Sequence, residues 1–203
     1  MKKLLFVTFI LLTNAYCAGI KAYFFNSAAE NEKSRPDEVI RESKVTQGEI
    51  VADLGSGGGY YTFRFSKEVG ESGKVFAVDV NVELLDLIKK NAEEKNIKNI
   101  IVTKADKNGV NLQENSIDLI FCRDVYHHLS GHEDYFRNLK KAAKKGGRLI
   151  IIDYLPKPFW SFHNLTGHYT LKETIRETLE KSGWIFDSEK DFLEEQSFQI
   201  FKN

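Results

Sequence analysis

A glycine-rich turn that follows a carboxylate is the part of the sequence best suited to hold a ligand. Residues 49–63, EIVADLGSGGGYYTF, carry an apolar stretch into Asp53 and then place glycines at 55, 57, 58 and 59. Glycine lets backbone N–H groups approach a ligand closely, and the helix expected next points its positive end at that ligand. A dinucleotide site wants Gly-x-Gly-x-x-Gly, but Tyr60 stands at the third glycine position. Asp53 would also repel a pyrophosphate by about 4 kcal/mol, for charges about 4 Å apart at an effective dielectric of about 20. The turn therefore favours a zwitterionic or cationic ligand.

The elements that must position this turn are strands and helices in alternation. Five continuously apolar runs are typical of parallel strands buried on both faces. They are EIVADL (49–54), KVFAVDV (74–80), NIIVTKA (99–105), IDLIFC (117–122) and RLIIIDYL (148–155). Helical patterns lie between them, which indicates a doubly wound, Rossmann-like α/β fold. The last two runs, WIFDSEKDFL and QSFQIFK, have no crossover helix between them and are expected to pair antiparallel. The sequence thus predicts a mostly parallel, seven-stranded sheet with a C-terminal hairpin.

Three hydroxyl side chains are predicted to cap helices. Ser34 precedes Pro36 and acidic residues, which suits a helix start. Ser130 with Glu133, and Thr170 with Glu173, have the spacing of a capping box. Residues 21–47 are expected to form an N-terminal helical segment, and residues 48–203 the main domain.

On these elements, the sequence resembles the class I methyltransferases that use S-adenosylmethionine. Their D/E-x-G-x-G-x-G motif is met by Asp53, Gly55, Gly57 and Gly59, with Ser56 inside it. The resemblance extends from about residue 35 to residue 203. It implies that this turn wraps the methionine half of S-adenosylmethionine.

The resemblance also implies roles for two later acidic residues. Asp79, with Val80 beside it, ends the second strand and should hold both ribose hydroxyls, since a carboxylate accepts from two donors at once. Asp106 follows the third strand and should meet the adenine amine.

The segment after the fourth strand, CRDVYHHLSGHEDYF, faces the methyl group in such relatives. This makes Asp124, His127 and His128 candidate catalytic residues, Arg123 a cofactor-binding candidate and Tyr126 a pocket candidate. Histidine accepts a proton near neutral pH. Neighbours on a helical turn point about 100° apart, so the two histidines are not expected to serve equally; alternatively, they cap, pack or solvate the turn. The pair resembles the HH of ubiquinone and menaquinone methyltransferase relatives, and of many small-molecule methyltransferases, and names no acceptor.

Aromatic residues gather between the fifth strand and the next helix, in LPKPFWSFHNLTGHYT (155–170). Phe159, Trp160 and Phe162 are expected to line an apolar acceptor pocket. The alternatives are that these rings pack on the protein itself or that they dip into a membrane. His163 and His168 lack a matching ligand set, and no metal site is predicted.

Residues 1–20 have the layout of a secretory leader or a membrane anchor, with Lys2 and Lys3 before an apolar stretch from Leu4 to Leu12. They indicate an exported or membrane-anchored protein; the alternatives are a misassigned start or a plain N-terminal helix, and a cytoplasmic location. Cys17 and Cys122 are not spaced for metal or redox work.

The charge balance argues against one class of partner, and the motifs rank three possible functions. The 29 basic residues equal the 29 acidic ones, so a nucleic-acid partner is not expected. The leading hypothesis is methyl transfer from S-adenosylmethionine to a small, apolar or lipid-like acceptor, with the oligomeric state left open. A non-catalytic S-adenosylmethionine-binding protein and, less favoured, a nicotinamide oxidoreductase are the alternatives.

Overall fold

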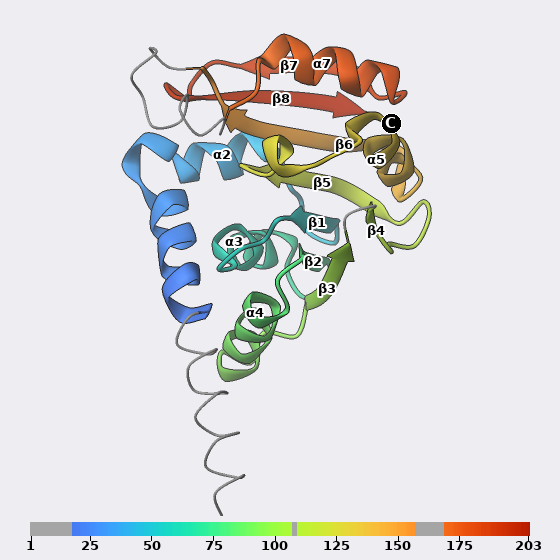
Figure 1. Ribbon diagram of the computed structural model, residues 1–203. Coiled ribbons are helices and arrows are strands. Elements are labelled where there is room, and N and C mark those ends of the chain that lie inside the picture. Colours follow the sequence, from blue (N-terminus) through green and yellow to red (C-terminus); the bar gives the residue numbers. More distant parts are fainter. Residues whose placement is uncertain (1–17, 107–108, 157–168) are drawn as a thin grey trace, which may run out of the picture.

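The computed structural model describes residues 18–106, 109–156 and 169–203 (Figure 1). Within these ranges, one sheet holds eight strands in the order β4-β3-β2-β1-β5-β6-β8-β7. Its parallel part consists of β1 (Ile50–Leu54), β2 (Lys74–Asp79), β3 (Ile100–Asp106), β5 (Ile117–Arg123) and β6 (Ala143–Tyr154). These strands pair in parallel with their neighbours, which confirms the predicted doubly wound α/β class.

The two edges of the sheet are antiparallel. At one edge β7 (Ile185–Lys190) pairs with β8 (Gln196–Lys202), and β8 pairs with β6, so the predicted C-terminal hairpin is confirmed. At the other edge β4 (Gly109–Val110) pairs with β3. The prediction of seven strands missed β4, because a strand of two residues is too short to show any hydrophobic period.

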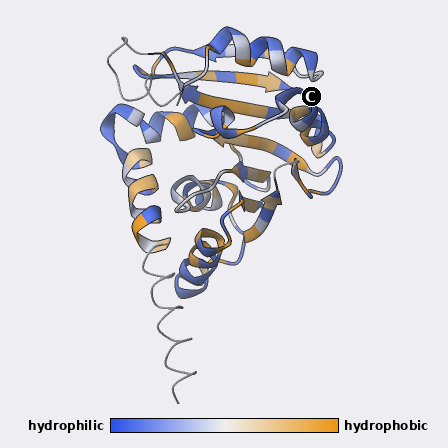
Figure 2. Ribbon diagram, viewed as in Figure 1, coloured by the Kyte–Doolittle hydropathy of each residue, from blue (hydrophilic) through white to orange (hydrophobic). Residues whose placement is uncertain are grey.

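Helices cover both faces of the sheet. They are η1 (Glu32–Ser34), α2 (Pro36–Ser43), α3 (Tyr60–Val69), α4 (Val82–Glu94), η2 (Tyr126–His128), α5 (His132–Lys140) and α7 (Lys172–Lys181), besides a helix over residues 18–30. Successive residues of one strand enter different core clusters: Phe121 packs with α2 and α3, and Ile120 with α5 and α7. This is the burial on two faces that continuously apolar strands require, and Figure 2 shows the hydrophobic colour concentrated in the strands.

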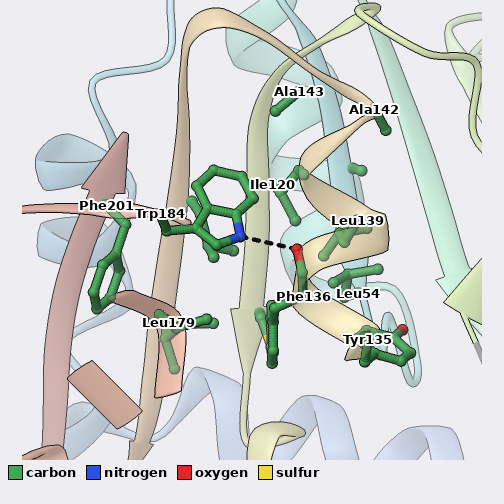
Figure 3. Packing of buried hydrophobic residues seen from close by; sticks show 14 of the residues in the cluster. Leu54, Ile120, Tyr135, Phe136, Leu139, Ala142, Ala143, Leu179, Trp184 and Phe201 are labelled. Carbon is green, nitrogen blue, oxygen red and sulfur yellow. Dashed lines mark hydrogen bonds between the residues drawn. The ribbon is translucent and has the colours of Figure 1, made fainter. Parts of the chain in front are cut away.

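The face under α5 and α7 is held by a large aromatic cluster. The indole of Trp184 is 2% exposed, and its Nε1–H donates to the carbonyl oxygen of Phe136 at 3.0 Å (Figure 3). A buried indole N–H usually needs such a partner. This contact fixes α5, and with it the turn between β5 and α5 that carries the candidate catalytic residues.

The three hydroxyl residues predicted to cap helices are not at the N-cap positions. Ser34 Oγ donates to Ala28 O at 2.8 Å and accepts from Arg123 Nη2, while Arg35 takes the N-cap position of α2. Gly131, not Ser130, is the N-cap of α5. Thr170 Oγ1 lies 3.4 Å from Asp153 Oδ2, and Leu171 is the N-cap of α7. These three predictions were wrong because tertiary acceptors, or a glycine with positive φ, replace the local caps.

The helix over residues 18–30 lies across the carboxyl ends of the strands (Figure 1). The boundary predicted at residue 20 falls inside it, and the rest of the predicted leader, residues 1–17, lies outside the described residues. Among the helices that the structure describes, none is long and apolar enough to span a bilayer.

Candidate cofactor and acceptor site

A cavity of about 720 Å³ opens where the parallel strands end. That volume is within the range of about 300–1,000 Å³ usual for small-molecule sites, and the place is the topological switch point between β1 and β5. Helix 18–30, the turn from β1 to α3, and the ends of β2, β3 and β5 form its wall. The predicted site residues that line it are Asp53, Gly55, Ser56, Gly57, Asp79, Val80, Asp106, Arg123, Asp124, His127 and His128.

Other predicted site residues lie elsewhere. Gly59 is the N-cap of α3, where its φ is 87°. Tyr126 is 2% exposed and stacks on His132 and Phe136, with ring centroids 4.4 Å and 5.6 Å away. Tyr126 is therefore a core residue, in contrast to its prediction as a pocket residue, because η2 turns it away from the strand ends. Phe159, Trp160 and Phe162 lie outside the described residues.

The glycine-rich turn is bare on two sides for two different reasons. Gly55 has a φ of 68°, and a Cβ there would lie 2.1 Å from Val125 Cγ2. A Cβ on Gly58 would lie 2.6 Å from Ala22 O and 2.3 Å from Asn26 Oδ1, both on helix 18–30. Asn26 Nδ2 also donates to Gly58 O at 3.2 Å. The missing side chain of Gly55 thus makes room for Val125, and that of Gly58 admits the helix that covers the turn.

Asp79 is oriented by hydrogen bonds from two backbone N–H groups. Its Oδ2 accepts from Gly57 N and its Oδ1 from Asn81 N, each at 2.9 Å. A carboxylate offers about four lone-pair sites, so both oxygens retain acceptor capacity for a vicinal diol. Asp106 is exposed at the end of β3 and accepts from Gly109 N at 3.1 Å.

The pKa of the Asp53 carboxyl group is subject to opposing effects. It is 3% exposed, and Thr62 Oγ1 donates to its Oδ2 at 2.6 Å. Burial raises its pKa to about 7, and the neighbouring Asp79 charge adds to that effect, whereas the Thr62 hydrogen bond opposes it. A cationic ligand would favour the ionised form, so Asp53 suits an ammonium group and not a phosphate.

We predict that cofactor affinity follows the ionisation of Asp53. With a pKa of about 7, the affinity for S-adenosylhomocysteine should rise about eightfold between pH 6 and pH 7.5. Within this window the α-ammonium of the ligand stays protonated, so the change in affinity reports the carboxyl group of Asp53. Calorimetric titration checks this, and Asp53→Asn should bind weakly at both pH values with no rise.

The same ionisation has an opposite effect on the ligand-free fold. Because the folded-state pKa of Asp53 is raised, the unfolded chain loses its proton first, and stability falls as pH rises from about 4 to about 7. Asp53→Asn should escape that loss, so its melting temperature should gain on that of the wild type between pH 5 and pH 8. A variant that lost stability equally at both pH values would contradict this assignment.

Arg123 holds a polar network at the end of β5. Its Nη2 donates to Ser34 Oγ at 3.0 Å and to Gln196 Oε1 at 3.2 Å, and lies 3.4 Å from Asp124 Oδ2. Its guanidinium carbon lies 5.4 Å from the centre of the Tyr61 ring. The side chain is 7% exposed, so the charge is held close to the cavity wall.

Buried polar atoms without a partner cluster at this cavity. In the described part of the chain, five buried side-chain atoms lack a hydrogen bond, and four belong to residues that line the cavity: Asn26, Ser56, Tyr61 and Arg123. Burial raises the pKa of Tyr61 to about 12, so its hydroxyl remains a donor. An orphaned buried donor costs about 1–3 kcal/mol, which a ligand carboxylate would relieve. The Ser56 and Tyr61 hydroxyls and Arg123 Nε–H are donors, whereas Asn26 Oδ1 is an acceptor. Carboxylates and unpaired donors in one cavity fit an α-amino-acid zwitterion, the methionine half of S-adenosylmethionine.

Asp124 adds a second carboxyl group to this wall. Burial raises its pKa to about 6, while the Arg123 charge opposes that shift, and Gln196 Nε2 donates to its Oδ1. Its backbone has a φ of 56°, which is uncommon for a residue other than glycine. Such strain often marks a functional site, and here it turns the chain from β5 into η2.

His127 is held by a fully buried carboxylate. Its Nδ1 lies 2.6 Å from Asp153 Oδ1, and its backbone N donates to Asp153 Oδ2 at 3.1 Å. Asp153 is 0% exposed and also accepts from Tyr154 N. This bond favours the tautomer with the proton on Nδ1, and the basic lone pair of the neutral ring is then on Nε2. The His128 ring lies beside it, with centroids 4.1 Å apart.

The sequence analysis did not identify Asp153. The signal was present, because Asp153 ends an apolar run, as Asp53 and Asp79 do. Its partner is set by the register of β5 against β6, which pairs Arg123 with Ile152. That register brings the next residue of β6 beside the turn that carries His127.

Comparisons with known proteins agree with this geometry. Residues 46–200 match the methyltransferase domain family. The chain is 29% identical over 116 residues, or 57% of its length, to the ubiquinone/menaquinone biosynthesis C-methyltransferase UbiE of Azotobacter vinelandii, and covers 46% of that protein. It is also 29% identical over 133 residues, 61% of its length, to the same enzyme of Cronobacter sakazakii, of which it covers 53%. The chain thus spans about half the length of these curated relatives.

Among solved structures, a SAM-dependent methyltransferase from Aquifex aeolicus superposes with a TM-score of 0.75 at 27% identity, covering 82% of this chain and 88% of that one. The family match takes in the glycine-rich turn, the acidic strand ends and the segment after β5. The chain therefore belongs to the methyltransferase domain family, and its fold is that of the class I methyltransferases that use S-adenosylmethionine.

Proposed function

We propose that this enzyme methylates a small, apolar acceptor that carries an ionisable hydroxyl, such as a phenol or quinol. The observation that carries the proposal is the His127–Asp153 pair beside the cavity. A histidine held in one orientation can act as a general base when the acceptor must lose a proton. The apolar side chains in the wall, Leu54, Val78, Leu84 and Leu129 among them, support an apolar acceptor. The names of the curated relatives, which act in ubiquinone/menaquinone biosynthesis, support a ring of this kind.

The cofactor is proposed to lie along the strand ends. Asp79 would hold the ribose hydroxyls, Asp106 the adenine amine, Asp53 the ammonium group, and Arg123 with Tyr61 the carboxylate. Bound S-adenosylmethionine supplies a methyl group made electrophilic by its sulfonium. Alignment of two bound reactants is worth up to about 7–11 kcal/mol, so binding residues account for much of the expected rate.

His127 is proposed as the general base. The hydroxyl proton of the acceptor passes to Nε2, and the electron pair left on oxygen makes both the oxygen and the ortho ring carbon nucleophilic. Methylation at carbon is completed when that carbon loses its hydrogen as a proton to solvent and the ring regains its aromaticity. The Asp153 carboxylate stabilises the resulting imidazolium through Nδ1–H. Asp153 is thus a positioning residue and not a catalytic one, since among the described residues its carboxylate bonds to His127, Tyr154 N and Thr170.

The test uses a matched pair of acceptors. Purified enzyme is incubated with S-adenosylmethionine carrying a tritiated methyl group and either a naphthoquinol or its dimethyl ether. Transfer to the quinol and not to the ether supports the proposal. Equal transfer to both, or transfer only to amines, would contradict it. If S-adenosylhomocysteine binds and no acceptor in a broad extract is labelled, the non-catalytic alternative stands instead.

Asp79→Asn tests the cofactor assignment separately from the acceptor. The change keeps one acceptor oxygen and the shape of the side chain, so we expect about tenfold weaker binding of S-adenosylhomocysteine. Binding of 2′,3′-dideoxyadenosine, which lacks the diol, should be unaffected by the substitution. Equal losses for both ligands would mean that Asp79 acts only by shaping the glycine turn through Gly57 N.

A further inference from the structure

Helix 18–30 carries its bulky apolar side chains on the outside of the molecule. Ile20, Tyr23 and Phe24 are 43%, 68% and 64% exposed, and their i, i+3, i+4 spacing puts them on one helix face. We call these three residues the outer face. The rings of Tyr23 and Phe24 pack edge to face, with centroids 5.9 Å apart. Figure 2 shows hydrophobic colour along this helix, in contrast to the hydrophilic turns of α7.

The opposite face of the same helix is made of small residues. Ala18, Ala22 and Ala29 are each 5% exposed, and the missing side chain of Gly58 lets the helix backbone approach the glycine turn. A surface helix normally turns its large apolar residues toward the core. This helix does the reverse, so its outer face is not explained by the fold of the domain.

The sequence before the helix indicates what covers the outer face. Lys2 and Lys3 precede the apolar stretch from Leu4 to Leu12, and residues 13–17 separate that stretch from residue 18, where the described helix begins. An amphipathic helix with aromatic residues on its apolar face is typical of binding within the headgroup region of a membrane. Tyrosine is enriched at that depth because its ring is apolar and its hydroxyl is wet.

We propose that the outer face rests on a phospholipid bilayer, with helix 18–30 lying along the surface. Phe25, the residue after the outer face, lines the cavity. The helix that covers the cofactor turn would therefore also hold the cavity at the membrane interface, where an apolar acceptor accumulates. The proposal concerns where the enzyme sits, and it stands or fails independently of the acceptor proposed above.

A site-specific probe separates the outer face from the segment before it. Ser27 is exposed and one turn beyond Tyr23 on the same face. Glu177 is exposed on α7, a helix that lies away from helix 18–30 (Figure 1). Ser27→Cys and Glu177→Cys are each labelled with bimane in full-length Cys17→Ser protein; Cys122 is buried. With phosphatidylcholine–phosphatidylglycerol vesicles, nitroxide lipids should quench the label at position 27 by at least half and leave the label at 177 unchanged.

A paired substitution measures the contribution of the outer face to binding. Tyr23→Ser with Phe24→Ser should weaken vesicle partitioning at least tenfold, by the loss of two interfacial rings. The control pair, Leu171→Ser with Ile185→Ser, removes side chains of similar exposure, 50% and 63%, from other elements and should change partitioning less than twofold. Both variants should bind S-adenosylhomocysteine as the wild type does, which verifies the fold.

Two results would overturn the proposal. If the protein floats with vesicles while the label at position 27 is unquenched, the N-terminal segment binds lipid alone. If sedimentation gives twice the monomer mass and vesicles capture nothing, the outer face is an interface between two copies.

Discussion

We expect His127→Asn to lower the rate of methyl transfer by about 10²- to 10⁴-fold, the usual contribution of a positioned general base, and to leave the binding of S-adenosylhomocysteine unchanged. The asparagine Nδ2–H can replace Nδ1–H as the partner of Asp153, so the buried carboxylate keeps a hydrogen bond. What is lost is the basic nitrogen. Single-turnover measurement of methyl transfer isolates the chemical step from product release.

The pKa of the acceptor distinguishes a base from a structural residue. For a series of phenols, the loss in His127→Asn should be largest for weakly acidic phenols and shrink for nitrophenols, which are already ionised. A residue that only shapes the pocket would affect all of them equally. His128→Asn, on the same turn, tests the alternative assignment; equal and acceptor-dependent losses in both variants would contradict a unique role for His127.

Asp153→Asn should lower the rate of methyl transfer in the same way as His127→Asn, but by less. The amide still fills the space between His127, Tyr154 N and Thr170, but it no longer stabilises an imidazolium. We expect about a tenfold to hundredfold loss in the rate of the chemical step, with unchanged KM for S-adenosylmethionine. An increase in KM alone would show that Asp153 supports binding instead.

Features of the site that depend only on residues close together in the chain could be predicted from the sequence. Asp53 and Asp79 each close an apolar strand, and parallel strands bring such ends to one edge. Asp153 has the same signal, yet its role depends on the register between β5 and β6. The missed caps have a similar cause: Ser34 and Thr170 are spaced for helix ends, but Arg123 and Asp153 offer them partners from distant parts of the chain.

Helix 18–30 shows why the N-terminal boundary could not be set from composition. Its buried residues are alanines and its exposed ones include Tyr23 and Phe24. A hydrophobicity pattern would therefore predict that the exposed face of this helix is the buried one. The signal for its packing lies in Gly58, which the D/E-x-G-x-G-x-G motif leaves unspecified. A glycine that faces protein rather than ligand looks the same in sequence as one that faces ligand.

We expect Arg123→Gln to weaken the binding of S-adenosylhomocysteine by about 100-fold, since truncating one partner of a buried charge pair costs about 2–5 kcal/mol. The same substitution should change the affinity for 5′-methylthioadenosine, which lacks the amino-acid half, by less than about threefold. Both affinities are measured by calorimetry at pH 7.5, where Asp53, with its pKa of about 7, is mostly ionised.

Tyr61→Phe separates binding from folding at the same place. The Tyr61 hydroxyl is buried without a partner, so removing it should leave the melting temperature of the free protein unchanged or slightly raised. Affinity for S-adenosylhomocysteine should nevertheless fall about tenfold, and that for 5′-methylthioadenosine should not. A lower melting temperature, or equal losses for both ligands, would mean that the hydroxyl serves the fold. A buried donor without a partner destabilises the free protein, and a ligand that accepts its hydrogen bond removes this cost only in the complex. Removing such a donor must therefore affect stability and binding in opposite directions.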